Sequence, residues 1–149
     1  MKMRTSLVPM VYVLGLSLVV GVLVLTVPST ASEITATVDI NPKTLNLNSS
    51  GTLITVYIEL PETHNVENIN VTTVRLETVQ AAWGNVEGNK LMVKFDRQTV
   101  IGYIWDRLYH MRNVPLPEEG VEVTLTITGK LYDGTTFEGS DKIIVIYHG

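Results

Sequence analysis

The chain has 149 residues, of which 45% are hydrophobic and 17% are charged, so it has room for one folded domain with a single core. Eleven Lys and Arg against fifteen Asp and Glu give a formal net charge of −4, and without a basic run no nucleic-acid partner is expected. No cysteine is present, which excludes disulfides, thiolate zinc sites and cysteine nucleophiles.

The N-terminal residues have the pattern of an export signal. Lys2 and Arg4 give a positive start, and an almost charge-free apolar stretch follows at 7–27. Small residues at Ser29 and Ala31 then occupy positions −3 and −1 of a signal-peptidase site. The apolar stretch is also long enough to cross a bilayer as an uncleaved anchor.

Both alternatives place the rest of the chain outside the cell membrane, because the positive N-terminus stays on the cytoplasmic side. We therefore expect a signal peptide or membrane anchor at 1–31 and an exported domain at 32–149. The domain is then either secreted or held on the extracellular side, with the membrane as a partner if the segment is not cleaved.

The exported part alternates polar and apolar residues with the period of β-strands. Strands are predicted at 35–40, 52–60, 71–79, 90–95, 121–132 and 135–147. Turn-rich sequence is expected at 46–51, and a glycine-rich loop at 84–89. The Asp133-Gly134 pair predicts a hairpin with a type I′ turn, and Gly139 predicts a bulge or bend.

One helix is predicted at 96–110, with the Asp96 carboxylate capping its first turn. Its apolar residues fall at helical spacing and predict a buried stripe made of Val100, Ile101, Ile104, Trp105 and Leu108. The charged residues between them are expected to face water: Arg97, Asp106 and Arg107. Gly102 weakens the helix, so only two or three turns are expected.

Together these elements predict an all-β fold. About seven strands separated by turn residues indicate a single antiparallel β-sandwich, immunoglobulin-like, with one short helix. The sandwich is preceded by the N-terminal hydrophobic helix at 1–31.

Several phrases in order resemble a poorly characterised β-sandwich module of archaeal and bacterial exported cell-surface proteins. The phrases lie at 39–47, 56–61, 66–71, 73–76, 91–97, 125–131 and 133–141. The resemblance covers nearly the whole exported part and implies an extracellular accessory domain without known catalysis. Many relatives carry a calcium-type Asp-x-Asp-Gly loop that matches 82–90, but this chain has only Glu87 as a carboxylate there. A calcium site needs more charged oxygen ligands, so no metal and no cofactor are predicted.

No set of residues has the spacing of a catalytic site. His64, His110 and His148 are scattered, and neither a nucleophile elbow nor a phosphate-binding glycine loop is present. We therefore predict that the protein is not an enzyme. A hydrolase or lyase that uses loops around Asp96 and Glu118 is kept as an alternative.

Three residues are singled out for other roles. Asn48 and Asn70 begin the two Asn-x-Ser/Thr triplets and are candidate glycosylation sites. Trp83, placed in the expected loop, is the tryptophan most open to a protein or glycan partner. The predicted function is a cell-surface binding or accessory module. The alternative is a structural subunit that assembles when residues 32–38 add a strand to a neighbouring copy.

Overall fold

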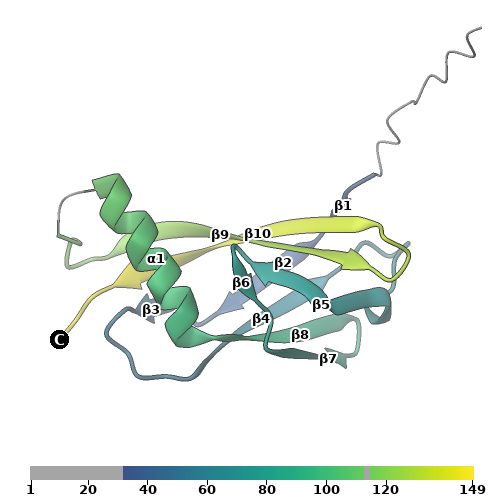
Figure 1. The fold of residues 1–149 in the computed structure, drawn as a ribbon, viewed down its shortest axis with the longest axis horizontal. Helices are drawn as coiled ribbons and strands as arrows, with labels where there is room; N and C mark the ends of the chain where they lie inside the picture. Colours follow the sequence, from purple (N-terminus) through teal and green to yellow (C-terminus); the bar gives the residue numbers. More distant parts are fainter. Residues whose placement is uncertain (1–31, 113–114) are drawn as a thin grey trace, which may run out of the picture.

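The chain folds as two β-sheets (Figure 1). The inward side chains of both sheets form one shared core. The computed structural model describes residues 32–112 and 115–149, so the predicted N-terminal segment at 1–31 lies outside them. The described residues form ten strands and one α-helix. The two-sheet all-β fold is confirmed, and the expectation of about seven strands is wrong.

The first sheet has the order β1-β10-β9-β5-β6, with β3 also paired to β10. Its strands are Ile34–Thr35 (β1), Thr44–Asn46 (β3), Ile69–Leu76 (β5), Val79–Gln80 (β6), Val121–Leu131 (β9) and Thr136–Ile146 (β10). The second sheet has the order β2-β4-β8-β7. Its strands are Thr37–Asn41 (β2), Leu53–Glu59 (β4), Trp83–Glu87 (β7) and Lys90–Asp96 (β8). A 3-10 turn, Val66–Asn68 (η1), precedes β5, and the helix Arg97–Arg112 (α1) follows β8.

The alternation in the sequence determines which side chains enter the core. On β4, Ile54, Val56 and Ile58 are at most 1% exposed, while the residues between them face outward. The described part of the chain buries no polar or charged side chain. The sheets are therefore held together by apolar burial, at roughly 25 cal/mol per Å² of surface removed from water.

The first part of the chain changes sheets twice. β1 pairs in parallel with the start of β10, β2 crosses to pair with β4, and β3 returns to pair in parallel with the end of β10. The sequence predicts one strand at 35–40, because the polar–apolar alternation continues through Ala36 where the chain leaves the first sheet. The parallel pairs also correct the expectation of a purely antiparallel sandwich.

Gly139 allows this crossing. A Cβ on Gly139 would come within 2.5 Å of the Ala36 carbonyl oxygen and of Val38 Cγ2. The pairing of β9 with β10 continues without a shift through Gly139, so the predicted bulge is wrong. The residue instead provides the space in which the crossing chain lies against β10.

Helix α1 is longer than the predicted two or three turns, since it has sixteen residues. The predicted cap is confirmed, because Thr99 N–H donates to Asp96 Oδ1 at 2.8 Å. Three of the predicted stripe residues are at most 5% exposed: Val100, Ile101 and Ile104. Two arginines expected to face water are half-buried instead: Arg97, which donates to Ser49 Oγ, and Arg107, which donates to the Thr124 carbonyl oxygen.

The hairpin between β9 and β10 is present, but its turn is not type I′. Gly134 has a φ of 89°, whereas Asp133 has no positive φ. Gly134 N–H donates to the Leu131 carbonyl oxygen at 2.9 Å, and Leu131 N–H donates to the Thr135 carbonyl oxygen at 2.8 Å. This is a three-residue loop that needs the left-handed conformation at Gly134 alone.

Candidate functional site

The outer face of the second sheet brings together side chains from four strands. The strand pairing aligns them in three rows across β2, β4, β8 and β7. We call this surface the platform. Its first row consists of Asn41, Thr55, Lys94 and Trp83, its second row of Asp39, Tyr57, Met92 and Asn85, and its third row of Thr37, Glu59, Lys90 and Glu87. All twelve residues are exposed or half-buried, so the platform is accessible across the width of the sheet.

Trp83 lies at the open edge of the platform and is 47% exposed. The Lys94 ammonium lies over its ring, 6.0 Å from the centroid, and donates to Thr55 Oγ1 at 2.6 Å. A cation over an indole face is attracted by the negative potential of the ring. Lys94 therefore links Trp83 on β7 to Thr55 on β4 across the face of the sheet.

The expected loop at 84–89 is wrong, because the structure forms strand β7 and a tight turn at this place. Gly84 allows β7 to approach its neighbours, since a Cβ there would lie 3.2 Å from the Met92 carbonyl oxygen. Gly88 has a φ of 64°, which a tight turn into β8 requires. Glycines that suggest a loop in the sequence thus place Trp83 on the edge strand of the sheet.

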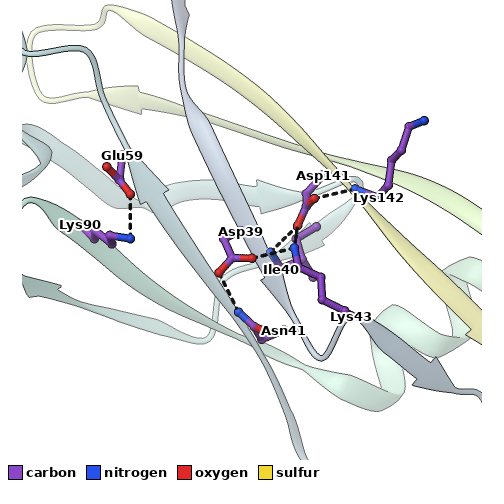
Figure 2. Close-up of polar contacts among 8 residues, drawn as sticks. All are labelled: Asp39, Ile40, Asn41, Lys43, Glu59, Lys90, Asp141 and Lys142. Atoms are coloured by element: carbon purple, nitrogen blue, oxygen red, sulfur yellow. Dashed lines mark hydrogen bonds and ion pairs between the residues drawn. The ribbon is translucent and has the colours of Figure 1, made fainter.

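The charges of the platform are largely paired. Lys90 Nζ lies 2.8 Å from Glu59 Oε1, as Figure 2 shows, and this hydrogen bond raises the pKa of Lys90. Asp39 lies 2.6 Å from Lys43 Nζ, whose hydrogen bond lowers the pKa of the Asp39 carboxyl. The twelve platform residues hold two ammonium groups, Lys90 and Lys94, and three carboxylates, with Glu87 as the third acid. Lys43, at the border, pairs with both Asp39 and Asp141.

At one border of the platform, Asp141 connects the two sheets (Figure 2). Its carboxylate accepts from Ile40 N–H at 2.7 Å, from the Lys43 ammonium and from Lys142 N–H. Burial alone would raise the pKa of Asp141, but the hydrogen bonds outweigh it and the pKa is lowered. The role is structural, because the carboxylate, carried by β10, supplies the acceptor for Ile40 N–H on the outer edge of β2, where the second sheet of the described chain has no further strand.

A second exposed aromatic pair lies at the helix. Trp105 and Tyr147 meet edge to face, with ring centroids 5.3 Å apart. They are 39% and 51% exposed, so the expectation that Trp105 packs into the core is wrong. Helical spacing alone predicts that Trp105 belongs to the buried stripe. In the structure its ring lies at the surface, in contact with Tyr147.

Glu77 joins the helix to the first sheet, and the sequence analysis did not identify it. Its carboxylate accepts from Thr126 N–H at 2.9 Å and from the Tyr103 hydroxyl at 3.0 Å. Burial, followed by the hydrogen bond to Glu77, raises the pKa of Tyr103. Glu77 also has a φ of 53°, a conformation uncommon for a residue with a side chain. No sequence pattern signals it, because it depends on the tight turn between β5 and β6.

The remaining predicted residues lie apart from the platform. Asn48 is exposed and donates to the His148 carbonyl oxygen at 3.3 Å. Asn70 is half-buried at the start of β5, and its Oδ1 accepts from Thr72 Oγ1 at 2.6 Å. Asp96 accepts from Thr99, chiefly from its hydroxyl, and its pKa is lowered as a result. Glu118 is exposed, so the two acids proposed for a hydrolase are not brought together by any contact among the described residues.

Within 32–112 and 115–149, no three His, Asp or Glu side chains form a group able to hold a metal ion. No helix in those two ranges combines the length and apolar character needed to cross a membrane. Comparison with known proteins finds no matching family model, no similar curated protein and no similar solved structure. The resemblance to exported β-sandwich modules therefore stays a prediction from the sequence.

Proposed function

We propose that the protein is a non-catalytic extracellular β-sandwich module, secreted or tethered to the cell membrane, that acts in binding or as an accessory domain at the cell surface. The observation that carries this proposal is the order of parts along the chain. A hydrophobic segment with a positive start, at 1–31, is followed directly by a two-sheet domain whose first strand begins at Ile34. We also infer an immunoglobulin-like sandwich, from two sheets of this size around one core.

The engagement of the acidic side chains supports a non-catalytic role. Asp96 caps α1, Glu77 joins α1 to β9, and Asp141 connects the two sheets. A general acid or base must reach a substrate proton in a cleft. These three carboxylates instead bond to backbone and side-chain groups that stabilise the fold.

The position of the first strands bears on the alternative of assembly by strand addition. Ile34, Ala36 and Val38 are between 6% and 9% exposed, and they lie in the chain's own sandwich. Residues 32–38 would have to leave this core before they could pair with a neighbour. This favours an independent module over a self-assembling subunit.

Export can be tested by cysteine labelling, because the chain has no cysteine of its own. Glu119→Cys places a thiol in the exposed turn before β9, and Lys2→Cys places one before the hydrophobic segment. A membrane-impermeant maleimide added to a culture of intact cells should label E119C, on the cells if the domain is tethered or in the medium if it is secreted, and should not label K2C while the cells are intact. Labelling of E119C only after lysis would refute the proposal. The intact mass of the purified protein then distinguishes cleavage before Ser32 from a retained anchor.

A further inference from the structure

The platform presents the more exposed of the two tryptophans in a preorganised position. Trp83 is 47% exposed, and Lys94, itself bonded to Thr55, supports its ring. A large, rigid and amphipathic aromatic side chain gives much contact area at little cost in conformational entropy. The arrangement is therefore suited to binding a ligand against the ring.

The dimensions of the platform favour an extended ligand. The row from Trp83 to Asn41 crosses four neighbouring strands, which is about 14 Å at the usual spacing between strands. Tyr57 and Met92 form the half-buried middle of the adjacent row. A short chain molecule can therefore lie across the sheet, with the indole at one end.

The charges of the platform determine the class of ligand. Glu59 is paired with Lys90, and Asp39 is paired with Lys43, which also pairs with Asp141. The twelve platform residues carry one more acid than base, and a single excess charge is too small to attract a polyanion or a polycation. Paired charges and amides such as Asn85 can still donate and accept hydrogen bonds. The small net charge and the many hydrogen-bonding groups thus favour an uncharged ligand rich in hydroxyl groups.

We propose that the platform binds a neutral glycan chain, with the apolar C–H face of one sugar ring stacked on Trp83. The hydroxyl groups of the chain bond to the amide, ammonium and carboxylate groups of the neighbouring rows. The inference rests on the proposed function, which places the platform at the cell surface. It names the partner that the cell-surface module takes.

The two tryptophans allow a direct test by fluorescence. The chain has only Trp83 and Trp105, so Trp105→Phe leaves Trp83 as the sole reporter and Trp83→Phe leaves Trp105. The full chain is purified in a polyoxyethylene detergent, which contains no sugar. Mannan, dextran, a β-1,3-glucan and arabinogalactan serve as neutral probes, and heparin serves as the charged probe. Thermal unfolding of each variant shows that it is folded.

With at least one neutral polysaccharide, the emission of W105F should change on titration and that of W83F should not. Trp83→Ala should raise the dissociation constant for the polysaccharide, measured from retardation of the protein in an affinity gel, by about tenfold or more. This is the effect of removing an aromatic anchor. Trp105→Ala is the matched control and should bind as the unaltered chain does. Binding should be the same in low and high salt, because the neutral polysaccharide carries no charge for salt to screen.

Three results would overturn the glycan proposal: no binding of any neutral probe, binding that W83A leaves unchanged, or salt-sensitive binding of heparin alone. None of them would affect the assignment as an exported module, which the cysteine labelling decides separately. Conversely, E119C that is labelled only after lysis, and neither on intact cells nor in the medium, would refute export whatever the platform binds in solution.

Discussion

Asp141 shows how one side chain can hold a crossing between sheets. Replacing Asp141 with Ala leaves the buried Ile40 N–H without its acceptor, and an unsatisfied buried donor costs about 1–3 kcal/mol of unfolding free energy. Asp141→Asn keeps an acceptor oxygen and should lose less. Urea denaturation measures the difference. Glu122→Ala, which removes the exposed pair with Lys142, is the control and should cause no measurable change. Equal stability of D141A and the unaltered chain would contradict the role.

Two glycines should respond in opposite ways to the same substitution. Gly139→Ala pushes a methyl group against the backbone of Ala36, and such overpacking costs about 1–3 kcal/mol. Gly102 is exposed on α1 with open space at its Cβ position, so Gly102→Ala should stabilise the protein by about 1 kcal/mol through helix propensity. Thermal unfolding followed by circular dichroism compares them. Stabilisation by G139A would show that β2 does not lie against β10 as described.

At the scale of elements, the cap of α1 offers the clearest prediction. Asp96→Ala removes the acceptor for Thr99 N–H, so the first turn should fray and the melting temperature should fall by a few degrees. Asp96→Ser retains a capping oxygen and should restore most of the loss. If D96S melts as low as D96A, capping is not the reason for the change.

The elements also show what the sequence could and could not predict. β4, β8 and β9 were predicted because one face of each is apolar throughout, and the hairpin and helix cap carry local signals at Gly134 and Asp96. The split of β1 from β2 was missed, because a change of sheet leaves the alternation intact. β7 was missed because its glycines, which permit close approach, also occur in loops. Trp83 was found as an exposed aromatic, but its partner Lys94 depends on cross-strand pairing that no local pattern gives.

At the scale of the whole molecule, stability should decline in acid. Hydrogen bonds lower the pKa values of four carboxyl groups in the folded state: Asp39, Asp96, Asp133 and Asp141. A lowered pKa stabilises the fold above the unfolded value of about 3.9. That stabilisation is lost as the pH falls through the lower folded-state values. The urea midpoint should therefore be steady between about pH 5 and 7 and fall below about pH 4.

The double variant Asp39→Asn/Asp141→Asn is the control for this pH dependence. It lacks two of the four carboxyl groups, so its urea midpoint should start lower at neutral pH and fall less steeply in acid. A variant whose midpoint declines as steeply as that of the unaltered chain would show that other groups dominate the acid response.

The parallel pairing of β1 with β10 has a mechanical consequence. The described chain enters through β1 at one end of the long axis and finishes beyond β10 at the other (Figure 1). A pull on the two ends, such as drag on a tethered module, would load the β1–β10 and β3–β10 hydrogen bonds in shear, so that they resist together and do not open one by one. The fold is thus arranged to bear tension along its length, and its lifetime under force is set by the rate of unfolding.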